Sequence, residues 1–100
     1  MKKKQAPELL AAVARRLQAL LLAEGLKDAQ IARKLGLKPQ TWSNYSEGKR
    51  PLPIDVALLL VKDYRITLDW LYRGDRAAMP HGVLTRIEQY YPSDGPASVN

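Results

Sequence analysis

A short stretch of the chain carries four polar side chains that could hydrogen-bond to the edges of nucleic-acid bases: Gln40, Thr41, Ser43 and Asn44. Trp42 and Tyr45 lie among them with a spacing of three residues, which indicates a helix with one apolar side. The four polar residues then fall on the other side. Their amides and hydroxyls are short groups that offer both donors and acceptors, which is the chemistry that base edges require. We therefore expect this face to be a reading surface.

The residues before this helix predict that it is the second of a close pair. A first helix is predicted over residues 28–35, and the reading helix over residues 39–46. Gly36 comes just after the first helix, where a left-handed backbone costs glycine nothing. Ala32 leaves room for the second helix to cross close by, and Pro39 suits the first turn of that helix. This spacing is typical of a helix-turn-helix.

Apolar periodicity and glycine stops predict further helices on both sides of this pair. Their ranges are residues 7–24, 54–63 and 68–72, with Thr67 as the N-cap of the last. One more short helix is predicted over residues 82–91, with an apolar stripe formed by Val83, Leu84, Ile87, Tyr90 and Tyr91. No segment alternates with the period of a strand. The predicted fold class is therefore all-α, a compact five-helix bundle followed by a short C-terminal helix.

The composition favours one small domain with a basic half. The chain has 100 residues and a net charge of +6. Residues 1–50 carry 11 Lys and Arg against 4 Asp and Glu, whereas residues 51–100 carry 5 against 6. All of the excess positive charge thus lies in the half that holds the reading helix, which favours a polyanionic partner. The chain has no cysteine and no apolar run that could span a bilayer, so we expect a cytoplasmic protein with no membrane partner.

Three features of the sequence belong together. They are the Ala32–Gly36 spacing, the GKRP run at residues 48–51 and the LDWLYRG phrase at residues 68–74. With these features the chain resembles the phage repressor and Cro-type helix-turn-helix regulators, also called the xenobiotic-response-element family. The resemblance covers roughly residues 17–75. It implies the lambda repressor-like fold, a five-helix bundle whose third helix lies in the major groove of DNA.

The resemblance also implies roles for individual residues. The base-facing residues would be Gln40, Thr41, Ser43 and Asn44, with the two amides suited to adenine. The phosphate contacts would be Lys38, Lys49 and Arg50, which position the domain without reading sequence. Some lambda-type repressors wrap DNA with a lysine arm, and the matching residues here are Lys2, Lys3 and Lys4.

The sequence departs from the family pattern at three places. Asp28 stands at the start of the second helix, where many members carry a Gln that contacts phosphate, and we expect it to cap the helix instead. Pro39 replaces a residue that often reads a base. Leu21 and Ser46 occupy the positions of an Arg–Glu pair that many members bury, so both charges are absent together.

The function predicted from these features is sequence-specific binding of double-stranded DNA by a transcriptional regulator. We expect a repressor that binds a palindromic operator as a homodimer, because one short helix reads too few base pairs to be selective in a genome. Two alternatives remain open. An antitoxin of a toxin–antitoxin pair would bind DNA and also a toxin or other protein. A protein-interaction module would keep the helix-turn-helix fold without binding DNA.

The predicted organisation places a basic arm at residues 1–6, the DNA-binding domain at residues 7–76 and the C-terminal helix within residues 77–91. Residues 92–100 are rich in Pro, Ser and Gly, which predicts a disordered tail. The apolar stripe of the C-terminal helix lies beyond the five-helix bundle. We expect it to form the dimer interface, although its two tyrosines could equally cover the domain's own core.

An enzymatic function has little basis in this sequence. His81 is the only histidine, and it stands between Pro80 and Gly82 in a predicted loop. No Ser–His–Asp set, metal-ligand cluster or glycine-rich phosphate loop can be assembled around it. We therefore expect no catalytic residue, no metal and no cofactor.

Overall fold

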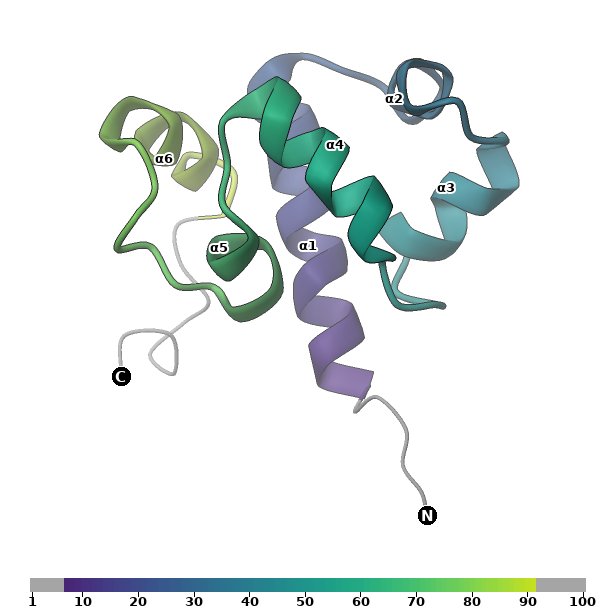
Figure 1. Cartoon of the computed structure of the whole chain (residues 1–100), viewed down its shortest axis with the longest axis horizontal. Coiled ribbons are helices and arrows are strands. Elements are labelled where there is room, and N and C mark those ends of the chain that lie inside the picture. The colour runs from purple at the N-terminus through teal and green to yellow at the C-terminus, as the bar shows by residue number, and fades with distance from the viewer. Residues whose placement is uncertain (1–6, 92–100) are drawn as a thin grey trace.

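The longest helix, α1 (Pro7–Glu24), is the axis on which three other helices pack (Figure 1). The computed structural model describes residues 7–91 of the chain. Leu17 and Leu20 in the middle of α1 are completely buried, and α3, α5 and α6 all contact this helix. The apolar side of α1 therefore supplies the centre of the core, as its helical periodicity predicts.

The helices α2 (Asp28–Leu35) and α3 (Pro39–Ser46) form the helix-turn-helix, with the bounds that the sequence predicts. Gly36 adopts the left-handed conformation, with φ of 72°. This turn lets the backbone N–H of Leu37 donate to the carbonyl of Ala32 at 2.8 Å, which satisfies one of the last carbonyls of α2. Ile31 and Trp42 are completely buried where the two helices meet.

Two further helices, α4 (Ile54–Tyr64) and α5 (Leu68–Arg73), complete the five-helix bundle. Each ends one residue later than predicted. The hydroxyl of Thr67 accepts a hydrogen bond from the backbone N–H of Trp70 at 2.9 Å, so the predicted N-cap of α5 is confirmed. Trp70 and Leu60 place both helices in the same core.

The last helix, α6 (His81–Glu88), begins one residue earlier and ends three residues sooner than predicted. It packs on α1, and its Val83 and Ile87 belong to the same core as the five preceding helices. Two ion pairs tie it to other parts of the fold: Arg86 with Glu24 at 3.1 Å, and Arg76 with Glu88 at 2.6 Å. The core therefore extends past residue 76, where the sequence predicts the end of the DNA-binding domain.

The sequence leaves open whether the C-terminal stripe covers a second subunit or the domain's own core, and the packing of the described residues favours the core. Val83 is 6% exposed and Ile87 is 0% exposed, while Leu84 and Tyr91 are half-buried against the same core. Only Tyr90, at 50%, keeps a large exposed surface. The stripe covers α1 because α1 still has an apolar surface that α3 and α5 leave open.

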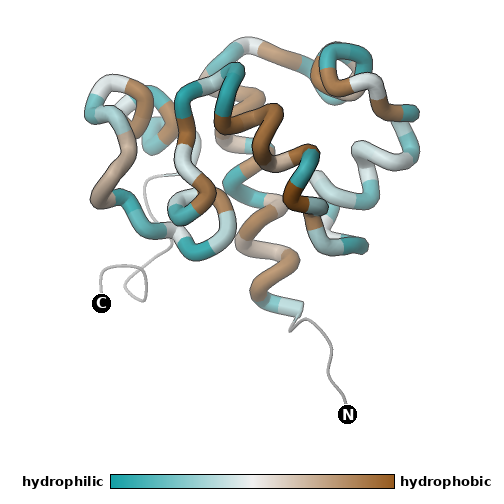
Figure 2. The backbone as a smooth tube through the Cα atoms, viewed as in Figure 1, coloured by the Kyte–Doolittle hydropathy of each residue, from teal (hydrophilic) through white to brown (hydrophobic). Residues whose placement is uncertain are grey.

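The prediction of an all-α fold is confirmed. Within residues 7–91 the chain forms six helices and no strand, an arrangement consistent with a lambda repressor-like fold. Figure 2 shows that the hydrophobic stretches lie mainly in α1 and α4, whereas α3 is mostly hydrophilic. No helix of this described part is long and apolar enough to cross a membrane. The predicted arm (residues 1–6, with Lys2, Lys3 and Lys4) and the predicted tail (residues 92–100) lie outside the described residues.

Candidate nucleic-acid interface

The outer face of α3 brings the four predicted reading residues together. Gln40 is exposed, and its side-chain amide donates to the amide oxygen of Asn44 at 3.3 Å, one helical turn away. Thr41 and Ser43 flank this pair and are half-buried. The face is therefore a compact row of donors and acceptors, and the amide–amide bond at its centre can be exchanged for bonds to a ligand.

The opposite side of α3 is fixed by Trp42, which is completely buried. Its indole N–H donates to the Oδ1 atom of Asp28 at 2.8 Å. A buried donor needs such an acceptor, since a missing partner costs free energy. Trp42 thus belongs to the core, and its hydrogen bond ties the start of α2 to the middle of α3.

This contact corrects the expected role of Asp28 as the N-cap of α2. Asp28 is the first residue of the helix, and the cap position belongs to Lys27. The backbone N–H of Lys27 is bonded instead by the side chain of Gln30, three residues on, at 2.7 Å. The carboxylate of Asp28 does not cap α2, because it points toward α3 and accepts the hydrogen bond from the indole of Trp42.

The C-terminal end of α3 is held against α1 by two features. The side-chain amide of Gln18 donates to the carbonyl of Ser46 at 2.6 Å, and Ser46 is buried. Gly48 then passes so close to α1 that a Cβ atom would lie 3.3 Å from the carbonyl oxygen of Leu10, and its φ of +75° also suits glycine. The loop after α3 is therefore pressed onto α1.

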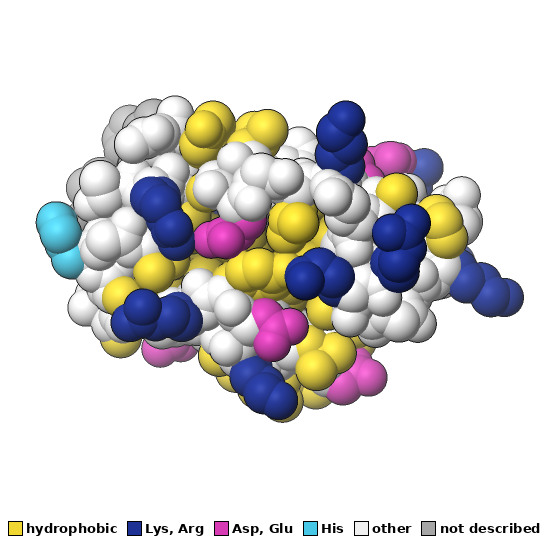
Figure 3. All heavy atoms as spheres, turned by 90° about the horizontal axis from the view of Figure 1, so that it is seen from above, with side chains coloured by type: hydrophobic (Ala, Val, Ile, Leu, Met, Phe, Trp, Pro, Cys, Tyr) yellow, Lys and Arg dark blue, Asp and Glu magenta, His cyan; other side chains and the backbone are white. Residues whose placement is uncertain are grey.

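The predicted phosphate contacts lie at both ends of α3. Lys38 precedes the helix, Lys49 and Arg50 follow it, and all three are exposed. The backbone N–H groups of Lys49 and Arg50 both donate to the carbonyl of Asn44 at 2.9 Å. These bonds position the two cations relative to the reading face. In Figure 3, Lys and Arg side chains project from the end of the molecule where α2 and α3 lie in Figure 1.

One residue that sequence reasoning missed alters this cationic set. Glu47 pairs with the ammonium of Lys49 at 3.0 Å, with both side chains more than half exposed. A carboxylate beside the reading face opposes an anionic ligand and neutralises part of the charge of Lys49. The signal in the sequence was the EGK run, in which Gly48 turns the chain so that Glu47 and Lys49 meet.

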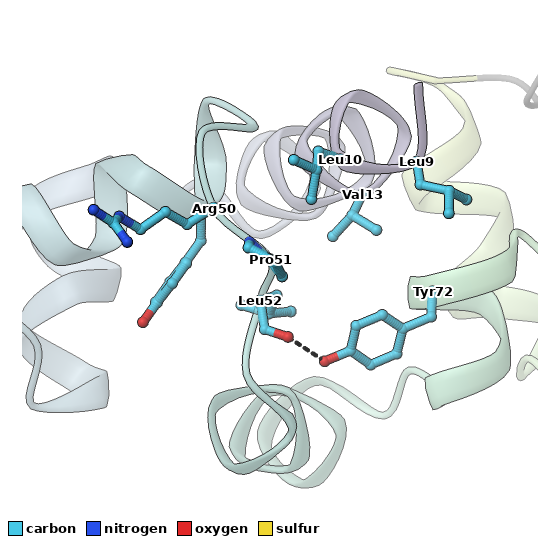
Figure 4. A pocket seen from close by; sticks show the side chains of 8 residues that line it. Leu9, Leu10, Val13, Arg50, Pro51, Leu52 and Tyr72 are labelled. Carbon is cyan, nitrogen blue, oxygen red and sulfur yellow. Dashed lines mark hydrogen bonds between the residues drawn. The ribbon is translucent and has the colours of Figure 1, made fainter. Parts of the chain in front are cut away.

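A cavity of about 220 Å³ lies between the start of α1, the loop after α3 and α5 (Figure 4). Its walls are mainly apolar and are formed by Leu9, Leu10, Val13, Tyr45, Arg50, Pro51, Leu52 and Tyr72. The hydroxyl of Tyr72 donates to the carbonyl of Leu52 at 2.7 Å, and burial raises the pKa of this phenol. Figure 4 shows Arg50 extending away from the other labelled side chains. Arg50 thus lines the cavity but its side chain extends away from the apolar walls.

The described part of the chain contains no cluster of metal-ligating side chains. No group of three or more His, Cys, Asp or Glu side chains within residues 7–91 could hold a metal ion. His81 is exposed at the first position of α6, and its backbone carbonyl accepts a hydrogen bond from the hydroxyl of Thr85 at 2.9 Å.

Comparison with known proteins agrees with this geometry. A model of the helix-turn-helix family matches residues 7–71, more than half of the chain. Comparisons with curated proteins and with solved structures give no match. Domains of this type bind DNA and are typically non-enzymatic regulators. The matched region contains α1 to α4 and most of α5, and the chain belongs to the helix-turn-helix family of the phage repressor and Cro type.

Proposed function

We propose that this protein is a sequence-specific regulator of transcription, a repressor that binds a palindromic operator in double-stranded DNA as a homodimer. The observation that carries the proposal is the division of α3 into two faces. Trp42 on one face is completely buried, whereas Gln40 and Asn44 form an open amide pair on the other. A helix anchored from behind in this way presents a fixed row of hydrogen-bonding groups to a groove.

Base reading is assigned to Gln40 and Asn44, with Thr41 and Ser43 as flanking contacts. The two amides lie one turn apart, so both can enter the same groove. An amide pairs in bidentate fashion with adenine, and each such pair discriminates against the wrong base by about 1–3 kcal/mol. The bond between the two amides, at 3.3 Å, holds them on one face before DNA arrives.

Phosphate contacts are assigned to Lys38, Lys49 and Arg50, with the lysines of residues 2–4 as an additional arm. The three described cations bracket α3 and are exposed. Contacts of this kind strengthen binding to every sequence and weaken steeply with salt. If each subunit engages about three to five phosphates, a dimer gives a slope of log K against log salt of about −5 to −9.

The test begins with selection of bound duplexes from a random DNA library, using the full chain. A palindromic consensus supports the proposal, and an absence of any consensus rejects sequence-specific binding. Asn44→Ala should then lower affinity for the selected operator and relax one position in each half-site. Its binding to random DNA should change little, because that binding rests on the cations.

Arg50→Ala is the matched counterpart on the same surface. It should weaken operator and random DNA alike and reduce the salt slope by about one per subunit, while the selected consensus stays the same. If Asn44→Ala and Gln40→Ala both leave the consensus intact, α3 is not the reader. A salt slope near zero for the unaltered protein would reject DNA binding as its main activity.

A further inference from the structure

The outer side of α4 carries three large apolar side chains that the fold leaves uncovered. Ile54 is 55% exposed, Leu58 is 50% exposed and Leu59 is 43% exposed, whereas Ala57 and Leu60 on the inner side are completely buried. In Figure 1, α4 lies at the front of the molecule, and no other helix stands between its outer side and the viewer. Apolar side chains grouped within one or two turns, unlike single ones, mark a contact surface.

Two opposite charges lie on the same outer side. Asp55 and Lys62 are both exposed and are seven residues apart, which is two helical turns, so they project in nearly the same direction. Asp55 is held at the start of α4, where its carboxylate accepts a hydrogen bond from the backbone N–H of Val56 at 2.9 Å. Lys62 lies in the last turn and forms no ion pair within residues 7–91. Along the outer side, Asp55 in the first turn and Lys62 in the last turn therefore stand on either side of Leu58 and Leu59, and the exposed Asp63 follows Lys62.

This arrangement of charges and leucines on α4 is complementary to the same surface of a second copy that runs in the opposite direction. The midpoint between Asp55 and Lys62 falls between Leu58 and Leu59, which is also the midpoint of the two leucines. A second α4 laid antiparallel across that point places Asp55 opposite Lys62 of the second copy, twice by symmetry. Leu58 then meets Leu59 of the second copy at the centre. A parallel pairing would instead bring like charges together at both ends.

We propose that α4 is the homodimer interface, in which two copies of this chain pair their α4 helices antiparallel about a two-fold axis between Leu58 and Leu59. The proposal rests on the dimeric state in the proposed function and names the surface that produces it. A two-fold axis is the symmetry that a palindromic operator demands. Along the chain, only the loop of residues 47–53 separates α4 from the recognition helix α3.

The alternative surface at the C-terminus is less suited to a second subunit. Val83 and Ile87 are already buried in the core of their own chain. Tyr91 lies against α1, where the guanidinium of Arg15 stands 5.5 Å from the centre of its ring. Leu22 on α1 is 58% exposed and is the only one of the strongly exposed large apolar residues of the described chain that lies in the last turn of α1. Along the lower edge of Figure 3, which is the front of Figure 1, hydrophobic side chains lie beside side chains of both charges.

Charge reversal tests the pairing with full-length protein and sedimentation equilibrium. Asp55→Lys leaves two lysines at the ends of α4, and Lys62→Asp leaves two aspartates. Each variant alone turns two attractive contacts into two repulsive ones, so its self-association should be about tenfold weaker or more. An equimolar mixture of the two variants restores both attractive contacts and should form a heterodimer of nearly the original strength. The double variant Asp55→Lys with Lys62→Asp should also self-associate.

Glu8→Lys is the matched control, because Glu8 is likewise an acidic residue in the first turn of an exposed helix end. It makes the same change of charge away from α4 and should leave association unchanged. Thermal melts followed by circular dichroism check that each variant is folded. Recovery of the dimer in the mixture is a second check, because two unfolded variants could not associate. The proposal is overturned if the unaltered protein is monomeric at every concentration, if the single reversals associate normally, or if the mixture fails to recover.

Binding to a single half-site separates this proposal from the proposed function. Lys62→Asp should bind an isolated half-site nearly as well as the unaltered protein but lose the cooperative binding to the full palindrome. If the unaltered protein forms the predicted dimer and yet binds no DNA, the proposed function fails and the interface stands. If the unaltered protein binds DNA but the charge reversals do not change its self-association, the proposed interface is wrong and the proposed function stands.

Discussion

Replacing Asp28 with alanine tests whether the contact between α2 and α3 stabilises the fold. The carboxylate of Asp28 accepts the indole N–H of Trp42 at 2.8 Å, and Trp42 is completely buried. In the variant the indole N–H has no acceptor, and a buried donor without a partner costs about 1–3 kcal/mol. Asp28 itself is exposed, so its removal leaves no cavity that would add to this cost. We expect Asp28→Ala to lower the free energy of unfolding by about 1–3 kcal/mol.

Asp28→Asn should cost less, because the amide oxygen remains an acceptor for the indole while the extra strength of a charged acceptor is lost. We expect a loss of less than about 1.5 kcal/mol. The assay is urea unfolding followed by circular dichroism, with the slope against urea unchanged. For a chain of this size each kcal/mol corresponds to a fall in melting temperature of about 4–8 °C.

Asp69→Ala is the control for the loss of a first-turn carboxylate. Asp69 is also the acidic residue in the first turn of its helix, but within residues 7–91 its carboxylate makes only an exposed pair with Arg73 at 3.6 Å. Its removal should cost less than about 0.5 kcal/mol. If Asp28→Ala costs no more than Asp69→Ala, the hydrogen bond to Trp42 contributes nothing. A double-mutant cycle of Asp28→Ala with Trp42→Phe that gives no coupling energy refutes the reasoning in the same way.

Three further changes test other contacts. Glu47→Gln should raise affinity for random DNA at low salt severalfold in fluorescence anisotropy, because it releases Lys49 from its 3.0 Å ion pair. Tyr72→Phe should cost about 1 kcal/mol in urea unfolding, whereas Tyr64→Phe should cost nothing, since the buried hydroxyl of Tyr64 has no hydrogen-bond partner within residues 7–91. Burial raises the pKa of both phenols above 10.0, so the folded state binds these protons more tightly than the unfolded state does. The free energy of unfolding should therefore fall as the pH rises past that value. A variant with both tyrosines changed to Phe should show a smaller fall. Ile87→Ala should cost about 2–5 kcal/mol, as expected for a residue of the monomer core, and an unchanged unfolding curve would contradict that placement.

The helices up to α3 could be predicted to the residue because the chain marks their ends with glycine and proline. Gly25 and Gly36 both adopt positive φ, and Pro39 stands at the first position of α3. Such stops act through the local backbone alone, so no knowledge of packing is needed to place them. The end of α4 lacks a glycine and uses Arg65 with φ of 61°. α5 also ends one residue later than predicted, although Gly74 caps it with φ of 76°.

The contacts that depend on tertiary packing could not be predicted in the same way. An apolar stripe shows that a helix must be covered but does not show what covers it. The sequence therefore leaves open whether a second subunit or the domain's own core covers the C-terminal stripe, and in the structure Val83 and Ile87 belong to the core of the same chain. Arg16 is a similar case, since it falls within the apolar stripe of α1, three residues after Val13, and is only 4% exposed. Its guanidinium donates to the carbonyl of Leu71 at 3.0 Å, and burial lowers its pKa.

The predicted reading surface depends on the same packing, because a polar face becomes a recognition surface only when the opposite face is anchored. α3 has eight residues, and isolated helices of that length are not stable in water. Its shape is therefore maintained by Trp42, by the indole bond to Asp28 and by the bond from Gln18 to Ser46. None of these contacts uses the amides of Gln40 or Asn44. Substitutions on the outer face should therefore change which sequences are bound without unfolding the domain, whereas a loss at the anchors lowers stability and recognition together.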